Sequence, residues 1–463
     1  MFKDLFRRQT LHIEIATFLI SFFLIVAVLQ FFTAQRWLYV LLLPLLLWGA
    51  HYHKQLGSFW FIMLEGTYIG VITWNIFKIY RIITFNFFNP PEWDFLAFWL
   101  DGRIASQHLN FYLPSNYLGY DLPVSISQEF TRSILEVGFR YPPPTMLLFL
   151  PLGWFDSLNS AYLGWQLFMV AVLGIDIFLL WKLFLDESHA LGLLVSGALV
   201  LSLPLTHFTF YLAQTNFLVL LALLLLLIHR EHFWGGMWLG IGIVVKPFVG
   251  LLFLFSVIQR RWQVVAGSII TYGFLSIIFV VLFGMTTFTS YFSERPPLKM
   301  PDYVYIEAVN QSLLAQILRL TNNDFSGISP IFNPIFIVIT LFLLTTTGAL
   351  TFFLKNDDSI WVFVLTLLTA LLIYPKTLFH YSVLLIIPMF VLWKYRNRWV
   401  GGLWGSVFII TLTYIFFLGN WKYTFLATTL FWFVFVAIGS WIVLVRSGKF
   451  SRINQLSNRP LKR

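Results

Sequence analysis

The chain has 463 residues, of which 59% are hydrophobic and only 11% are charged, and its mean hydropathy is +0.80. A soluble domain carries about 25% charged residues, so lipid must be the solvent for most of this chain. The net charge of +10 does not indicate nucleic acid, because the basic residues flank apolar runs, and the absence of cysteine excludes disulfides and thiolate chemistry. We therefore predict an all-α integral membrane protein that forms a single multi-spanning domain over residues 1–463.

Apolar runs long enough to cross a hydrocarbon layer of about 30 Å recur along the whole chain. The first run lacks a small-residue cleavage site, which predicts a retained helix and not a removed signal peptide. We expect a bundle of about 12 to 14 transmembrane helices, given the length that each crossing needs. The predicted spans are 13–32, 36–50, 59–79, 160–184, 190–210, 216–229, 262–283, 334–354, 360–375, 380–393, 399–418 and 424–445.

Basic residues at both ends of the chain predict the topology. Lys3, Arg7 and Arg8 precede the first predicted span, and the tail 446–463 is basic without any acidic residue. Positively charged flanks stay on the cytoplasmic side, so both termini are expected there, in the cytoplasmic membrane.

Two long polar segments then fall on the outer face, at about 81–145 and 284–333. Both are rich in aromatic residues and leucine, which predicts short helices lying along the membrane surface. The apolar stretch 146–155 is too short for an ordinary span and follows three prolines, so we expect a juxtamembrane or re-entrant element there.

The stretch 233–258 is apolar but interrupted at its centre by Lys246 and Pro247. Two half-helices that meet at the proline fit this pattern best. Broken backbone at membrane depth is tolerated only inside protein or beside a wet cavity, so the break indicates a cavity.

Ionisable side chains near membrane depth are functional candidates by default. Asp94 lies among aromatic residues just past the third predicted span, where burial raises a carboxyl pKa and favours a general base. A helix N-cap explains the same aspartate equally well. Lys246 is explained either by a role in binding an anionic head group or by a structural role as a snorkelling side chain. Lys376 and His380 lie one turn apart if a helix begins there, so both could contact one anion.

The sequence contains no Walker loop, no GxSxG or HExxH motif and no Asp-x-Asp pair. A carboxylate base, several cations and a cavity remain, and this set fits transfer of a group from a lipid phosphate to an acceptor hydroxyl. Such a reaction requires no metal and no cofactor.

Short motifs in a fixed order then resemble a known family. They are WDFLAFWLDGR at 93–103, NFYLP at 110–114, FRYPP at 139–143, LPL at 150–152, AQTN at 213–216, Gly240 to Lys246 and Pro247, NQSLL at 310–314, and YP to HY at 374–381. This order resembles glycosyltransferase family 87, the polyprenol-phosphate-sugar-dependent mannosyl and arabinosyl transferases of the C-type superfamily. The residues 376–379 depart from the family, which often has a Trp-Asp pair before the histidine.

The resemblance implies a C-type glycosyltransferase bundle and a role for each candidate residue. Asp94 is expected to deprotonate the acceptor hydroxyl. The residues expected to hold the donor phosphate are Lys246, His380, Lys376 and Arg140. The residues expected to line the substrate cavity are Tyr141, Gln214, Asn216, Asn310 and Gln311, although the amide side chains could equally form hydrogen bonds between helices.

From these observations we predict an inverting glycosyltransferase that moves a sugar, mannose in our interpretation, from a polyprenyl monophosphate to a lipid-linked or envelope acceptor. Its active site is expected to face the outside, with membrane lipids as partners and no nucleic acid. An envelope glycan ligase or polymerase acting on lipid diphosphates is one alternative. A lipid or glycolipid transporter is another, although the sequence shows no inverted repeat.

Overall fold

The structure is a computed structural model that describes residues 57–89, 94–117, 141–185, 189–294, 305–321, 330–354, 359–396, 405–410 and 423–446, with a few isolated positions before residue 57. Within these ranges all regular elements are helices, and one isolated bridge joins Asn310 to Leu378. The all-helical prediction is confirmed for this part of the chain. Most of the predicted spans 13–32, 36–50 and 399–418 lie outside the described residues.

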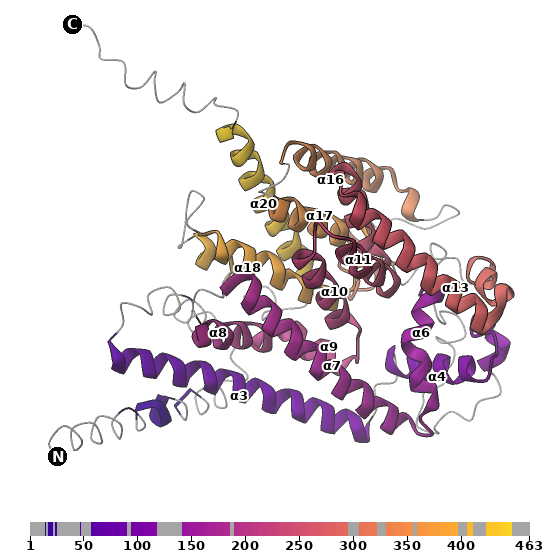
Figure 1. The fold of residues 1–463 in the computed structure, drawn as a ribbon, viewed down its shortest axis with the longest axis horizontal. Helices are drawn as coiled ribbons and strands as arrows, with labels where there is room; N and C mark the ends of the chain where they lie inside the picture. Colours follow the sequence, from indigo (N-terminus) through magenta and orange to yellow (C-terminus); the bar gives the residue numbers. More distant parts are fainter. Residues whose placement is uncertain are drawn as a thin grey trace, which may run out of the picture.

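The helices of the first half follow the predicted order (Figure 1). They are α3 (Ser58–Phe88), α4 (Asp94–Ser106), α6 (Met146–Phe149), α7 (Leu158–Leu180) with a π-helical turn η5 (Trp181–Leu185), α8 (His189–Ser202), α9 (Pro204–Tyr211), α10 (Asn216–Ile228), α11 (Phe233–Val245) and α12 (Leu251–Ile258). Short 3-10 helices occupy η2 (Pro114–Tyr117), η3 (Pro143–Thr145), η4 (Leu150–Trp154) and η7 (Pro247–Gly250).

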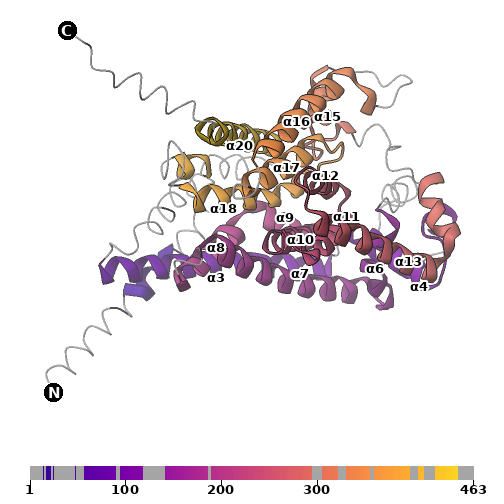
Figure 2. The same cartoon turned by 45° about the horizontal axis from the view of Figure 1, so that its top comes forward.

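The second half continues in the same manner. Its helices are α13 (Trp262–Ser293), α15 (Leu313–Thr321), α16 (Pro334–Phe353), α17 (Ser359–Ile373), α18 (Ile386–Lys394) and α20 (Thr424–Arg446), with 3-10 helices η8 (Pro330–Phe332) and η10 (Phe379–Leu385). In both views α10 and α11 lie between a side formed by α3 and α7 and an opposite side formed by α16, α17 and α20 (Figures 1 and 2).

Within the described ranges four helices are long and apolar enough to cross a membrane, beginning at Leu158, Trp262, Pro334 and Thr424. The pair α8 and α9 forms a fifth candidate, bent by 60°. The remaining apolar helices, among them α10, α11, α12 and α17, are shorter. On α13, Phe274 is 61% exposed, Ile277 64% and Val281 78%, which gives this helix an outward apolar face suited to lipid. The chain is therefore a multi-pass membrane protein.

Three element boundaries differ from the prediction. The helix α3 runs to Phe88, past the predicted end at 79, and Lys78 packs over the ring of Trp74 at 5.6 Å without ending the helix. The predicted span 190–210 breaks at Leu203, since Pro204 offers no N–H and disfavours helical backbone before it. Helix α13 continues beyond 283 to Ser293, with a kink at Gly284, where φ is 81°.

Small residues allow α11 and α13 to pack backbone against backbone. Gly236 and Gly240 form a GxxxG spacing on α11; Gly267 of α13 faces Gly236, and Ser268 and Thr271 of α13 face Gly240. A Cβ atom on Gly236 would lie 2.1 Å from the carbonyl oxygen of Val264, and one on Gly267 would lie 2.3 Å from that of Phe233. This contact fixes the half-helix that ends at Lys246.

The described part of the segment predicted as the first outer loop folds back against the end of α13 near Ser290. In both views α4 and α6 lie beside that part of α13 (Figures 1 and 2). Asn110 Nδ2 donates to Ser290 Oγ at 2.9 Å, and the Phe111 ring contacts the rings of Phe279 and Phe283. The stretch 146–155, expected as one juxtamembrane or re-entrant element, contains α6 and η4 in succession and is preceded by η3. Gly102 and Gly153 let α4 approach it closely.

Candidate functional site

Asp94 is the first residue of α4, a helix whose side chains are mostly buried. The Phe98 ring stacks on Phe149 with centroids 4.1 Å apart and contacts the edge of the Tyr141 ring at 5.7 Å. These contacts hold the start of α4 against the segment after Tyr141. The Asp94 carboxylate is partly buried and accepts a hydrogen bond from Gln214 Nε2 at 2.5 Å.

Lys246 stands at the break between α11 and η7, and its side chain is almost completely buried. Its ammonium donates to the hydroxyls of Tyr141 at 3.1 Å and Tyr381 at 3.0 Å, and to Gln214 Oε1 at 3.5 Å. It also lies 5.0 Å from the ring centroid of Tyr141 and 4.3 Å from that of Tyr381. Ring faces and neutral oxygens therefore stabilise this buried cation. We call Asp94, Gln214, Lys246, Tyr141 and Tyr381 the polar cluster.

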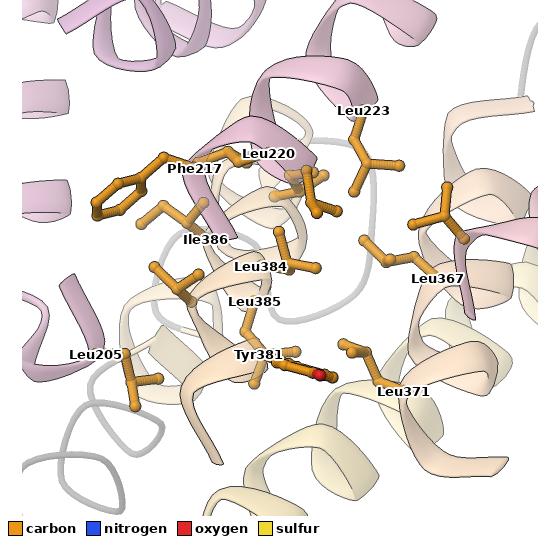
Figure 3. Close-up of a cluster of buried hydrophobic side chains, with 14 of the residues drawn as sticks. Leu205, Phe217, Leu220, Leu223, Leu367, Leu371, Tyr381, Leu384, Leu385 and Ile386 are labelled. Carbon is orange, nitrogen blue, oxygen red and sulfur yellow. The ribbon is translucent and has the colours of Figure 1, made fainter. Parts of the chain in front are cut away.

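An apolar layer holds Tyr381 in place. Its ring packs among buried leucines that include Leu371, Leu384 and Leu385 (Figure 3). The Phe248 ring stacks on it at 5.5 Å with an interplanar angle of 25°. Because the ring is fixed on these sides, its hydroxyl is directed toward Lys246.

Gln214 enters the polar cluster from a strained turn between α9 and α10. Ala213 has a φ of 51°, in the left-handed region that non-glycine residues rarely adopt. Trp165 Nε1 donates to the Ala213 carbonyl at 2.8 Å, and the Gln214 backbone N–H donates to the Thr209 carbonyl at 2.9 Å. A strained backbone persists only where the surrounding contacts hold it in that conformation, and such strain is typical of functional sites.

Asn216 connects the same turn to η10. Its Nδ2 donates to the backbone carbonyl of His380 at 3.1 Å and to Thr209 Oγ1 at 3.3 Å. The His380 side chain is buried, and neither of its ring nitrogens has a hydrogen-bond partner among the described residues. Buried ring nitrogens normally find a partner, so this imidazole is available to a ligand.

Asn310 and Gln311 hold the second outer loop against the turn that precedes η10. Asn310 Nδ2 donates to the Pro375 carbonyl at 2.9 Å, and the Gln311 backbone N–H donates to the Thr377 carbonyl at 2.6 Å. Gln311 Oε1 also accepts from the Phe425 N–H at 3.2 Å. Both amide residues thus join elements distant in sequence.

Lys376 lies in this turn and not on a helix, since η10 begins only at Phe379. Lys376 and His380 therefore do not lie one turn apart on the same helix, as the sequence-based prediction required. Its position is set instead by the loop that Asn310 anchors. Its ammonium is nevertheless close enough to act electrostatically on Asp94 and on Glu307 of the second outer loop.

Burial raises the pKa of the Asp94 carboxyl above its ordinary value, and Lys246, Lys376 and the hydrogen bond from Gln214 offset part of that rise. A raised pKa makes the carboxylate a stronger proton acceptor. Burial and the nearby Asp94 also raise the pKa of the Tyr141 hydroxyl well above its usual range, so that it stays neutral.

The structure brings Asp94, Lys246, Tyr141 and Gln214 together, with Asn216 and His380 attached through one backbone carbonyl. Arg140 lies outside the described residues. Tyr381 was not predicted as a site residue, although it stands beside His380 in the same motif. No group of three or more metal-ligand side chains occurs in the described part of the chain.

The fold and the polar cluster define a membrane-embedded helical protein with an acid and a buried cation at one site. The chain belongs to glycosyltransferase family 87, whose sequence model matches residues 139–379, more than half of its length. This confirms the family resemblance seen in the sequence. The matched segment contains Gln214 and Lys246, whereas Asp94 precedes it and His380 directly follows it.

The chain is also similar to alpha-(1->3)-arabinofuranosyltransferases from two strains of Mycobacterium tuberculosis, CDC 1551/Oshkosh and ATCC 25618/H37Rv, with 27% identity over 145 residues in each case. The aligned segment covers 29% of this chain and 33% of each relative, so the chain matches about a third of their length. No solved structure matches the chain.

Proposed function

We propose that this chain transfers a sugar from a polyprenyl-phosphate donor to an acceptor hydroxyl, with Asp94 as the general base. The observation that carries the proposal is the position of the Asp94 carboxylate and the Lys246 ammonium on opposite ends of the Gln214 amide. The Asp94 carboxylate can accept the proton that leaves the acceptor hydroxyl. The Lys246 ammonium can stabilise the negative charge of the phosphate that leaves the sugar.

In this reaction the acceptor oxygen attacks the anomeric carbon while the bond from that carbon to the phosphate oxygen breaks. The acceptor proton passes to Asp94, and the bonding electron pair departs with the polyprenyl phosphate. A direct displacement of this kind inverts the anomeric configuration.

The departing phosphate needs positive charge and hydrogen-bond donors. Lys246 supplies a buried ammonium, and Lys376 a second one from the anchored turn. The His380 imidazole has both ring nitrogens without a partner among the described residues, so it can donate to a phosphate oxygen. Arg140 remains a proposed contributor.

The sugar is mannose in our sequence-based interpretation, whereas the relatives are named as arabinofuranosyltransferases. Both donors share a polyprenyl phosphate, which is the part that the cations above would bind. The acceptor is proposed to be a lipid-linked or envelope glycan at the outer face of the cytoplasmic membrane, with both termini inside.

The test uses the purified full-length chain in nanodiscs. Polyprenyl-phosphate mannose and polyprenyl-phosphate arabinofuranose are supplied in separate arms, each with alkyl glycosides as acceptors, and products are followed by mass spectrometry. We expect glycosidic bond formation and release of polyprenyl phosphate with one donor. Turnover only with lipid diphosphate donors would favour a ligase or polymerase. Movement of lipid across the bilayer without bond formation would favour a transporter.

A further inference from the structure

Building on the proposed function, we propose that Gln214 is a positioning residue that keeps the Asp94 carboxylate and the Lys246 ammonium apart. The carboxylate then stays free to accept a proton, and the ammonium stays free for the donor phosphate. Gln214 would act through these two groups and not by contact with the reacting atoms.

The hydrogen bonds of Gln214 have a defined direction. Its Nε2 donates to Asp94 Oδ2 at 2.5 Å, while its Oε1 accepts from Lys246 Nζ at 3.5 Å. An amide is one of the few neutral groups that satisfies an anion and a cation simultaneously. Among the described residues no direct ion pair forms between Asp94 and Lys246.

The amide cannot easily leave this position. Gln214 is only 1% exposed, and it follows Ala213, whose left-handed backbone is held by Trp165. The hydrogen bond from the Gln214 N–H to Thr209 fixes its own backbone. The turn therefore orders Gln214 before any substrate binds, as a positioning residue requires.

The separation matters because charges attract strongly in a poorly solvated site. Two opposite unit charges in contact attract each other several times more strongly in such a site than in bulk water. A direct pair between Asp94 and Lys246 would lower the basicity of the carboxylate and occupy the ammonium. Among the described residues, the other charged or titratable groups that interact with Asp94 are Lys376, Tyr141 and Tyr381.

Two substitutions at this position give opposite expectations. Gln214→Ala opens space through which the flexible Lys246 side chain reaches Asp94. We expect the acid limb of kcat/KM to move to lower pH by about one unit, because the new ion pair favours the carboxylate form. Gln214→Leu keeps the space filled but removes the hydrogen bond to Asp94. We expect the acid limb to move to higher pH, because an apolar neighbour disfavours the carboxylate.

Binding of polyprenyl monophosphate, followed by tryptophan fluorescence, gives a readout that does not depend on turnover. Gln214→Ala should weaken this binding by about 10-fold, because the ammonium is then engaged by Asp94. Gln214→Leu should bind at least as tightly as the wild type. Shifts of both acid limbs in the same direction, or equal binding by both variants, would overturn the proposal.

Gln166 offers a matched control. It is as deeply buried as Gln214, but its Nε2 donates to the backbone carbonyl of Phe210, at 2.8 Å, and it bonds neither Asp94 nor Lys246. Gln166→Ala and Gln166→Leu should lower the melting temperature without moving the acid limb or the lipid-phosphate affinity. If the wild type transfers no sugar, the proposed function fails, whereas the binding comparison still tests the separation of Asp94 and Lys246.

Discussion

The Lys246 ammonium lies 4.3 Å from the ring centroid of Tyr381 and donates a hydrogen bond to its hydroxyl at 3.0 Å. Tyr141 holds the same ammonium on another side. A buried cation held by neutral oxygens and ring faces keeps much of its attraction for an anion. The expected effects of substitution follow from this arrangement.

Lys246→Met should weaken binding of polyprenyl monophosphate by at least about 10-fold, because the methionine keeps the volume but loses the charge. The measurement is fluorescence titration in nanodiscs. Lys182→Met is the control, since Lys182 also lies over an aromatic ring, that of Trp181 at 4.7 Å, but outside the polar cluster. Equal losses in both variants would contradict a phosphate site at Lys246.

Asp94→Asn should lower kcat by about 10²- to 10⁴-fold, the usual contribution of a general base, while lipid-phosphate binding persists. Single-turnover assays with the active donor measure this loss. Asp156→Asn is the control, because Asp156 is exposed and follows Phe155, whose carbonyl accepts a hydrogen bond from Trp99 of α4. An active Asp94→Asn variant would remove Asp94 from the mechanism.

The pH dependence of kcat/KM should have an acid limb above the ordinary carboxyl range. Burial raises the pKa of Asp94, so protonation as the pH falls through this raised value inactivates the base at a pH where exposed carboxylates are still ionised. A profile over a broad pH range, with stability checked at each point, measures the limb. A limb at or below the usual aspartate value of 3.8 would show that another group limits the rate.

Gly267→Leu should destabilise the protein by at least about 1–3 kcal/mol, because its side chain would collide with the backbone of α11 near Phe233. Thermal melting in detergent measures this effect. The matched control is Gly273→Ala on the same helix, where a Cβ atom meets nothing within 4 Å. That control should leave the melting temperature equal or slightly raised.

Asp176→Leu should raise stability by about 1–4 kcal/mol, because a buried polar group without partners opposes folding. Asp176 lies inside α7, and neither carboxyl oxygen has a hydrogen-bond partner among the described residues. Asp101→Leu should have the opposite effect, since its Oδ1 accepts from the Tyr117 hydroxyl at 2.5 Å. Loss of turnover in a stable Asp176→Leu variant would instead reveal a functional acid.

Several features of the fold were predictable because they depend on local chemistry. The free energy of transferring an apolar run into lipid is a sum over its own residues, so hydropathy located α7, α16 and α20, and the start of α13, within a few positions. The break at Lys246 was equally local, since Pro247 cannot continue the hydrogen bonds of α11. The charges of Lys78 and Arg81 ended the apolar run before the true end of α3 at Phe88.

The candidate site was predictable only as a set of separate residues. The sequence by itself determined that Asp94, Lys246 and His380 are ionisable groups placed where lipid makes charge unfavourable. Only the tertiary structure decided that Gln214 stands between the acid and the lysine, and that Tyr381 completes the surroundings of the cation. Burial preferences belong to single residues, whereas these contacts join helices far apart in the chain and depend on how those helices pack.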